Sequence, residues 1–321
     1  MVRWGILGTA RINRRVIPAM RLARRSELVA IASRDRRRAE AYAREWSIPR
    51  ADAGYQTLLD SPGIDAVYIP LPNTDHVPWT LAAIAAGKHV LCEKPLALDA
   101  ADVDRIAAAA ADAGVVVEEG FMYRHEPLTT HVTSMIRDGA VGEVRAIVSG
   151  FTFALDTGTN IRLDPSLGGG SLWDVGSYPV TYAQLIMGHE PKMVFGTAHW
   201  HASGVDEEFM GLLRFEEGAT ANIYAGFRVA YRTWLEILGS DGALTVPNPF
   251  RPGPLETLEL ERKGQIERIA VAGAAEIFVK EIENFEARVL DGAPAVVSLA
   301  ESHRTAATLS ALYGSARSVV S

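Results

Sequence analysis

The chain has 321 residues, of which 48% are hydrophobic and 22% are charged, and its formal net charge is −7. This ordinary composition excludes collagen-like and disordered chains, and no uninterrupted apolar run is long enough to span a membrane as a helix. The acidic balance offers no electrostatic footprint for a nucleic-acid partner. The length suggests two domains, and the default expectation is then a ligand site in the cleft between them.

The cysteine content and the N-terminal segment both bear on cellular location. Cys92 is the single cysteine, so no internal disulfide can form. Residues 1–8 run from a charged residue straight into a strand-like segment without a cleavable signal. The simplest expectation is a cytoplasmic protein.

Short apolar runs alternate with helix-like segments from Val2 to about Gly120. The runs include VRWGILG, LVAIAS, AVYIP, HVLCE and VVVEEG, and the expected helices cover about 14–24, 36–46, 76–86 and 100–113. Such runs lack polar alternation, which is typical of a parallel sheet with both faces buried. Residues 1–122 are therefore predicted to form a doubly wound Rossmann domain that binds a dinucleotide.

The pattern changes after about Arg124, where strand-like runs follow one another between Met193 and Val271. The helices expected in this half cover about 126–137, a segment ending near 188, 277–290 and 300–319. Residues 123–321 are therefore predicted to form an α/β domain for substrate binding and oligomerisation, built on a large, mostly antiparallel open sheet arranged as a meander. Its uncovered face would expose apolar area, which predicts a homodimer or a dimer of dimers through this sheet.

A glycine-containing turn follows the first strand. Gly8 fills the first position of the G-x-G-x-x-G pattern, whereas Ala10 and Asn13 replace the other two glycines. The place of this turn between a strand and a helix favours pyrophosphate binding by backbone N–H groups, and an ordinary tight turn is the alternative. The cofactor contacts expected here are Gly8, Thr9, Ala10, Arg11 and Ile12.

The second strand ends in a cluster of cations. In NAD-binding enzymes an acidic residue at this end bonds the ribose hydroxyls, but here Glu27 lies at the opposite end of the strand. Cations in a first helical turn oppose the helix dipole, and a 2′-phosphate bound by Ser33, Arg34 and Arg38 would offset that cost. The cluster favours NADP(H) over NAD(H), and a solvated charged face is the alternative.

Two further segments fall at the carboxyl edge of the predicted parallel sheet, where doubly wound folds bind ligands. Pro95 fixes the chain direction after the fifth strand, so that the ammonium of Lys94 points into the cleft. The cofactor contacts expected from the two segments are Leu71, Pro72, Asn73, His76, Glu93 and Lys94.

Five motifs follow one another along the chain: GILGTARI, IPLPNTDH, GKHVLCEKPLAL, EGFMYRHEP and GGGSLWDVGSYPV. Together they resemble the glucose-fructose oxidoreductase and inositol dehydrogenase (Gfo/Idh/MocA) family of nicotinamide-dependent oxidoreductases, over essentially the whole chain. The resemblance implies a Rossmann domain, a second α/β domain whose open sheet mediates oligomerisation, and hydride transfer at a sugar or other cyclic alcohol carbon without a metal.

The same resemblance implies site residues. By position, Lys94 matches the family's catalytic lysine, and Asp174 and Tyr178 match its pair in the second domain. Tyr178 makes the chain similar to the branch of NADP-dependent xylose dehydrogenases, dihydrodiol dehydrogenases and keto-sugar reductases. Ser33 and Arg34 are similar to the NADP-binding pair of that branch.

Hydride transfer at a carbinol carbon also requires a group that moves the hydroxyl proton. A free tyrosine has a pKa near ~10, and a neighbouring lysine ammonium lowers it towards neutral pH. We assign Tyr178 as proton donor and acceptor, tuned by Lys94, with Asp174 four residues earlier on one helical face to bond substrate hydroxyls or orient Lys94. Further substrate contacts are expected from Tyr123, Arg124, Arg162 and Trp173.

The sequence thus favours an NADP(H)-dependent oxidoreductase acting on a sugar, either an aldose dehydrogenase or a keto-sugar reductase. The alternatives are a trans-dihydrodiol dehydrogenase and a non-catalytic NADP-sensing regulator, although a regulator has no need of Lys94 and Tyr178. His199 and His201 share one strand face, but no carboxylate or cysteine is expected beside them, so no metal site is predicted.

Overall fold

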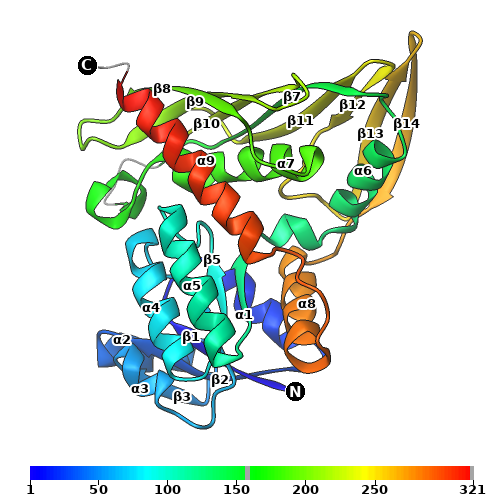
Figure 1. The fold of residues 1–321 in the computed structure, drawn as a ribbon. Coiled ribbons are helices and arrows are strands. Elements are labelled where there is room, and N and C mark those ends of the chain that lie inside the picture. Colours follow the sequence, from blue (N-terminus) through cyan, green and yellow to red (C-terminus); the bar gives the residue numbers. More distant parts are fainter. Residues whose placement is uncertain (156–159, 319–321) are drawn as a thin grey trace. The chain divides into compact units, whose positions relative to one another are not determined.

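The computed structural model describes residues 1–155 and 160–318, and the chain divides into two compact units (Figure 1). The first unit comprises Met1–Met122 and Phe278–His303, and the second comprises Tyr123–Ile277 and Arg304–Ser321. The expected division into 1–122 and 123–321 differs from these units in residues 278–303. That segment returns to the first unit because Trp4 Nε1 donates to Glu286 and Arg288 pairs with Glu118.

The first unit is built on a six-stranded parallel sheet in the order β3-β2-β1-β4-β5-β6, which confirms the predicted Rossmann fold. Its strands are β1 (Val2–Leu7), β2 (Ser26–Ser33), β3 (Arg50–Ala53), β4 (Ala66–Ile69), β5 (His89–Glu93) and β6 (Val117–Gly120). Its helices are α1 (Asn13–Leu22), α2 (Arg36–Glu45), α3 (Tyr55–Leu59), α4 (Asn73–Ala85), α5 (Ala100–Ala113) and α8 (Ile277–Asp291), whose first residue belongs to the second unit. Strand order reverses between β1 and β4, and ligands of such folds bind at this switch point.

The helices that were expected in the first unit lie within about three residues of their expected bounds, whereas the short α3 was not expected. The largest shift is in α4, which starts at Asn73 and not at His76. Its first turn forms early because the N–H of Asp75 already donates to the carbonyl of Pro72, 2.8 Å away. This extra turn places the start of α4 at the carboxyl edge of β4.

The second unit is built on an eight-stranded sheet in the order β14-β13-β12-β11-β7-β10-β9-β8. Its strands are β7 (Val144–Thr152), β8 (Met193–Trp200), β9 (Asp206–Arg214), β10 (Thr220–Gly226), β11 (Arg232–Gly239), β12 (Gly242–Val246), β13 (Leu255–Arg262) and β14 (Gln265–Ala272). The predicted large, mostly antiparallel sheet is confirmed. The expected single meander is wrong, because β7 lies in the middle, parallel to β10, and later strands add on both of its sides.

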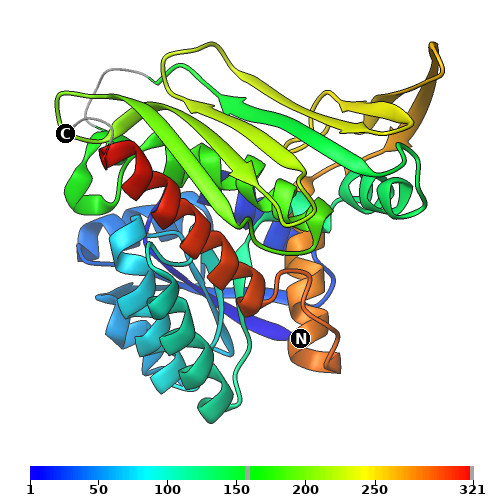
Figure 2. The ribbon, with the colours of Figure 1, turned by 45° about the horizontal axis from the view of Figure 1, so that its top comes forward.

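Helices cover one face of this sheet. Figure 1 shows α6 (Pro127–Arg137), α7 (Ser177–Met187) and α9 (Leu299–Ser318) on the same side of it, and Figure 2 shows the strands from the other side. The expected end of the last helix at Val319 lies outside the described residues. The opposite face exposes apolar side chains at alternate positions, namely Met193, Phe195, Met210, Leu212 and Leu238. Within the residues that the structure describes, no helix has the length and apolar character needed to cross a membrane.

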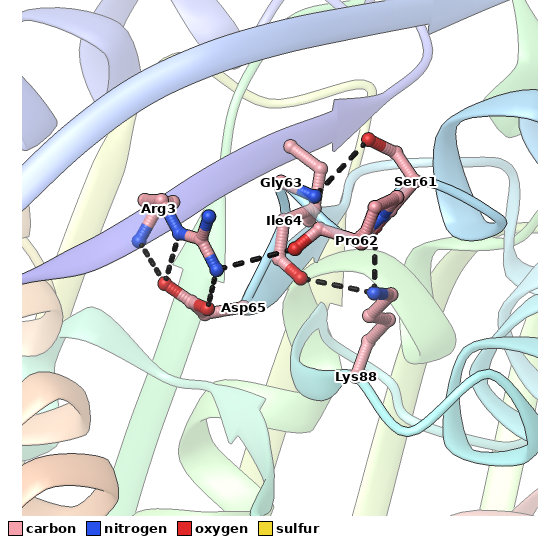
Figure 3. A network of polar contacts seen from close by, with 7 residues as sticks. All are labelled: Arg3, Ser61, Pro62, Gly63, Ile64, Asp65 and Lys88. Atoms are coloured by element: carbon pink, nitrogen blue, oxygen red, sulfur yellow. Dashed lines mark hydrogen bonds and ion pairs between the residues drawn. The ribbon is translucent and has the colours of Figure 1, made fainter.

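A polar network closes the amino edge of the first unit's sheet (Figure 3). The guanidinium of Arg3 on β1 donates to both carboxylate oxygens of Asp65 at 2.6 and 2.9 Å. The ammonium of Lys88, just before β5, donates to the backbone carbonyls of Ser61 and Ile64 at 2.8 and 3.0 Å. These contacts fix the starts of β1, β4 and β5 at the edge opposite to the expected cofactor site.

Replacing Lys88 by methionine should lower the free energy of unfolding by roughly 1–3 kcal/mol, because two backbone carbonyls lose their donor. The matched control is Lys280→Met on α8, whose exposed ion pair with Glu283 contributes at most about 1 kcal/mol. Urea unfolding of both variants measures the difference, and kcat should stay unchanged. Equal stability of the two variants would contradict this role for Lys88.

Candidate active site

The glycine turn after β1 is ordered by two backbone-directed bonds. Gly8, with φ +105°, donates its N–H to the carbonyl of Ala32 at 2.8 Å. The buried side-chain amide of Asn13 donates to the carbonyl of Gly8 at 2.9 Å. Asn13, which replaces the third glycine of the motif, thus closes the turn with a side-chain bond. A Cβ on Gly8 would lie 2.8 Å from Leu71 Cδ2, so the turn packs directly on the segment after β4.

Asp35, the acidic residue that follows β2, caps the N-terminus of α2. The carboxylate of Asp35 accepts the N–H of Arg38 at 3.0 Å, and the Ser33 hydroxyl accepts the N–H of Asp35 at 3.3 Å. The Arg38 guanidinium reaches back to the carbonyl of Thr9 at 3.3 Å. The exposed Arg34 lies close enough to Tyr55 to oppose the rise in the pKa of its hydroxyl that burial causes. Cationic groups therefore stand beside the glycine turn, while the nearest carboxylate is occupied by the helix N-terminus.

His76 links the two segments at the carboxyl edge of β4 and β5. Its Nδ1 lies 2.7 Å from the carbonyl oxygen of Pro95, and its Nε2 lies 2.8 Å from the carbonyl oxygen of Leu71. The ring is 1% exposed, and burial lowers the pKa of the imidazole. His76 therefore links these two segments, and its expected contact with a cofactor stays a prediction.

Lys94 lies between two anchored neighbours. The hydroxyl of Tyr68 donates to the Glu93 carboxylate at 2.6 Å, and the N–H of Leu96 donates to the Glu119 carboxylate at 2.8 Å. Burial, followed by the charge of Glu93, raises the pKa of Tyr68 well above its ordinary value, so that this hydroxyl stays protonated. Glu119 was not among the residues predicted for the site, although two consecutive glutamates at the end of an apolar strand are a signal for buried, bonded carboxylates.

In the second unit, Asp174 and Arg162 form an ion pair through Asp174 Oδ2 and Arg162 Nε. The guanidinium of Arg162 also lies over the ring of Phe153, 5.6 Å from its centroid. The charge of Asp174, with a smaller contribution from Tyr178, raises the pKa of Arg162. Three of the residues expected in the site, Asp174, Arg162 and Tyr178, are thus brought together.

The backbone around Asp174 differs from the α-helix expected there. Leu172–Gly176 form a π-helix, and α7 starts at Ser177. Asp174 therefore lies in the π-helix and Tyr178 in α7, and not in one continuous α-helix as expected. Pro179 sits in the first turn of α7, where a missing N–H costs little.

Aromatic rings enclose Tyr178, which is 4% exposed. Its ring centroid lies 5.3 Å from that of Phe151 and 5.4 Å from that of Phe250. Tyr123 is fully buried beneath it, stacks on Tyr182 at 5.3 Å and donates its hydroxyl to Thr181 at 2.9 Å. Tyr123 therefore packs against Tyr178, and its expected contact with substrate stays a prediction.

Trp173 and Arg124 complete the expected substrate contacts. Trp173 is 7% exposed, and its ring packs 6.0 Å from that of Tyr313 on α9. This packing makes Trp173 a contact between the π-helix and α9, and its expected contact with substrate stays a prediction. Arg124 is half-buried in the short 3₁₀ helix Met122–His125.

Close backbone packing explains the triglycine segment. A Cβ on Gly169 would lie 2.5 Å from the carbonyl oxygen of Arg162. The N–H of Gly170 donates to the same oxygen at 2.9 Å, and the φ of Gly170 is +127°. The glycines therefore let the Arg162 segment lie directly against the start of the π-helix, within reach of Asp174.

The two histidines that were expected on one strand face have separate partners, and His201 lies just beyond the end of β8 at Trp200. His199 Nε2 lies 3.3 Å from the carboxylate of Glu207, and His201 Nδ1 lies 2.9 Å from the Ser203 hydroxyl. The expectation that no carboxylate lies beside His199 is wrong, because β8 and β9 pair and bring Glu207 next to it. In residues 1–155 and 160–318, no group of three potential metal ligands is found.

The first unit has a doubly wound sheet with a glycine turn and cations at its carboxyl edge. The second unit has its own sheet and carries a tyrosine beside an ion pair. These features together are typical of a two-domain, dinucleotide-dependent oxidoreductase. Residues 2–121 match the profile of an oxidoreductase family with an NAD-binding Rossmann fold. Residues 129–245 match the profile of the GFO/IDH/MocA C-terminal domain. The chain belongs to the Gfo/Idh/MocA family of oxidoreductases, which confirms the resemblance seen in its motifs.

Relatives and solved structures agree with this assignment. The chain is 38% identical over 316 residues to a D-xylose 1-dehydrogenase (NADP(+)) from Haloferax volcanii, covering 98% of this chain and 97% of the relative. It is 35% identical to a dTDP-3,4-didehydro-2,6-dideoxy-α-D-glucose 3-reductase from Actinomadura kijaniata, covering 91% and 88%. The crystal structure of a 3-ketoreductase from Actinomadura kijaniata with NADP and TDP-benzene matches with a TM-score of 0.92 and 33% identity, covering 98% and 97%. The predicted fold and enzyme class are thereby confirmed.

Proposed function

We propose that this chain is an NADP(H)-dependent oxidoreductase that transfers a hydride between the nicotinamide and a carbinol or carbonyl carbon of a sugar. One observation carries the proposal: Lys94 follows β5 at the carboxyl edge of the parallel sheet, and Tyr178 lies beside the Asp174–Arg162 pair. The ketoreductase from Actinomadura kijaniata has been crystallised with its lysine changed to alanine or glutamate and with its tyrosine changed to phenylalanine. That lysine and that tyrosine are separated in sequence as Lys94 and Tyr178 are here.

The proposed chemistry divides between the side chains of the site. When bound, the nicotinamide supplies or accepts the hydride. The hydroxyl of Tyr178 would give a proton to the carbonyl oxygen in reduction and take one from the substrate hydroxyl in oxidation, and the ammonium of Lys94 would donate to the same oxygen. Asp174 accepts bonds from substrate hydroxyls and Arg162 donates to them, while Arg124 contributes a further donor.

The proposed cofactor is NADP(H) in preference to NAD(H). The carboxylate of Asp35 is engaged by the N–H of Arg38, which leaves Ser33, Arg34 and Arg38 to bind a 2′-phosphate. The backbone of the glycine turn binds the pyrophosphate at the start of α1. The remaining proposed contacts are Gly8, Thr9, Ala10, Arg11, Ile12, Leu71, Pro72, Asn73, Glu93 and Lys94.

The substrate class is tested by following nicotinamide absorbance. Purified protein is assayed for NADP⁺ reduction with a panel of aldoses that includes D-xylose and D-glucose, for NADPH oxidation with keto-sugars, and for NADP⁺ reduction with trans-diols. Turnover of a sugar supports the proposal. Turnover confined to trans-diols overturns the sugar assignment, and tight NADPH binding without any turnover indicates a regulator.

The division of labour between the chain's two halves is also a proposal. Residues 1–122 would bind the dinucleotide, and residues 123–321 would bind substrate and a second copy of the chain. We infer a cytoplasmic location from the single buried Cys92, which forms no disulfide, and from the supply of NADP(H) that the reaction needs.

The open face of the eight-stranded sheet should hold the protein in at least a dimer. Phe195 and Leu212 pair across β8 and β9 on this face and are 51% and 41% exposed. Leu212→Lys should shift the mass measured by light scattering at micromolar concentration towards the monomer. Leu290→Lys on α8, where the leucine is 42% exposed, is the control and should leave the mass unchanged. A wild-type monomer under these conditions would contradict the proposed assembly.

A further inference from the structure

Asp206, the first residue of β9, carries a carboxyl group that is buried completely within the second unit. Its Oδ2 accepts the Ser171 hydroxyl and the N–H of Leu172, each at 2.7 Å. Its Oδ1 has no hydrogen-bond partner among the described residues and would lie 2.3 Å from a Cβ on Gly170. The carboxyl group is therefore pressed against the backbone of Gly170, Ser171 and Leu172.

This backbone begins the segment that carries the proposed substrate residues. Leu172 is the first residue of the π-helix, and the N–H of Asp174 donates to the carbonyl of Gly170 at 3.1 Å. The Ser177 hydroxyl donates to the carbonyl of Asp174 at 3.2 Å, and α7 follows with Tyr178. A displacement at Ser171 and Leu172 is thus passed on to Asp174 through bonds within the same short segment.

We propose that Asp206 is a positioning residue for the reaction: its ionised carboxylate fixes the start of the π-helix and thereby sets Asp174 and Tyr178 for substrate. The proposal rests on the proposed function of those two residues. An ionised acceptor forms shorter and stronger hydrogen bonds than a neutral one, so the charged form of Asp206 holds Ser171 and Leu172 more firmly. Protonation would weaken both bonds without any change in shape.

The charged groups on the elements around Asp206 are engaged elsewhere. Arg162 pairs with Asp174, and His199 on β8 and Arg228 after β10 both lie within ion-pair distance of Glu207. Arg317 on α9 donates to the carbonyl of Gly204 and to the Tyr313 hydroxyl, and Glu208 accepts from Arg228 and Tyr224. His201 bonds Ser203. The two donors to Asp206, by contrast, are neutral.

Burial gives Asp206 a protonation equilibrium near neutrality. It raises the pKa of the carboxyl from 3.8 to about 7, against the opposing effect of the bonds from Ser171 and Leu172. The folded protein therefore takes up a proton here more readily than the unfolded chain does. The charged form predominates above about pH 7. Its burial costs free energy of folding at such pH values, but it then holds Ser171 and Leu172 most firmly.

The test compares Asp206→Asn, which keeps the shape but is always neutral, with the wild-type protein across pH. At about pH 9 the variant should show a roughly tenfold lower kcat/KM for the sugar, and at about pH 5 the two proteins should agree, because both are then neutral at this position. The Kd for NADPH should not differ at either pH. Glu208→Gln, two residues further along β9, is the matched control and should show no pH-dependent loss.

Hydrogen exchange provides a measurement that does not depend on turnover. Amides of residues 171–178 should exchange about tenfold faster in Asp206→Asn than in wild type at about pH 9, and equally fast at about pH 5. The proposal would be overturned if Asp206→Asn lowered kcat/KM equally at both pH values, or if it differed from wild type only in the free energy of unfolding. Asp206 would then be a structural residue. Absence of sugar turnover in wild type would refute the proposed function, whereas the exchange result would still decide the role of Asp206.

Discussion

Replacing Lys94 by methionine should lower kcat for the sugar by roughly 10²–10⁴-fold while leaving the Kd for NADPH within about threefold of wild type. The physical reason is that, in the proposed mechanism, the ammonium of Lys94 acts on the proton-transfer step, so that its removal takes a hydrogen-bond donor from the reacting oxygen. Tyr178→Phe removes the transferable proton itself and should cause a loss of similar size. Steady-state kinetics measures kcat, and nicotinamide fluorescence measures the Kd.

The matched control for the tyrosine is Tyr182→Phe, one helical turn further along α7. Tyr182 is fully buried and stacks on Tyr123. The substitution therefore removes a hydroxyl from the same aromatic cluster, but not the hydroxyl that is proposed to transfer the proton. This variant should keep kcat within a few-fold of wild type. Turnover near the wild-type rate in both Lys94→Met and Tyr178→Phe would refute the catalytic assignment.

Replacing Arg34 by alanine should raise the KM for NADPH by roughly 10- to 100-fold, because a charge-assisted bond to the 2′-phosphate contributes about 1.5–3 kcal/mol. The KM for NADH should change little, since NADH lacks that phosphate. The measurement is a pair of cofactor titrations at fixed, saturating substrate, performed at one ionic strength because salt screens this interaction.

Arg36→Ala, two residues further along and at the start of α2, serves as the control. Arg36 is exposed, and its guanidinium lies 3.9 Å from the carboxylate of Glu40 on the same helix. Its removal changes the net charge as Arg34→Ala does, but should leave both KM values near those of wild type. A similar rise in KM for NADPH and NADH in Arg34→Ala would exclude 2′-phosphate recognition by this residue.

The parallel sheet could be predicted from sequence because its determinants are local. Unbroken apolar strands alternate with helical segments, and the placement of Lys94 after one such strand was enough to put it at the ligand-binding edge. The antiparallel sheet was predicted as a sheet but not in its order. The central place of β7 depends on pairing with β10 and β11, which lie far along the chain, and no local pattern specifies such pairing.

Only part of the candidate site could be predicted from the sequence. Asp174 and Tyr178 follow from the family motif, whereas the π-helix that contains Asp174 depends on tertiary bonds such as the one from Leu172 to Asp206. The buried position of Tyr123 depends on an aromatic cluster assembled from distant segments. Links of this kind between remote residues decide whether a polar or aromatic side chain faces ligand or core.

The central claim is hydride transfer between NADPH and a sugar carbon, and isotope transfer tests it most directly. NADPH that carries deuterium at nicotinamide C4 is incubated with protein and a keto-sugar that is turned over, and the product is analysed by NMR. We expect deuterium on the new carbinol carbon in wild type, and very little labelled product with Tyr178→Phe, because that variant lacks the proton donor and turns over slowly. The experiment is done with each of the two faces of the nicotinamide labelled in turn. A product that forms at the wild-type rate but carries no deuterium with either label would contradict hydride transfer from NADPH.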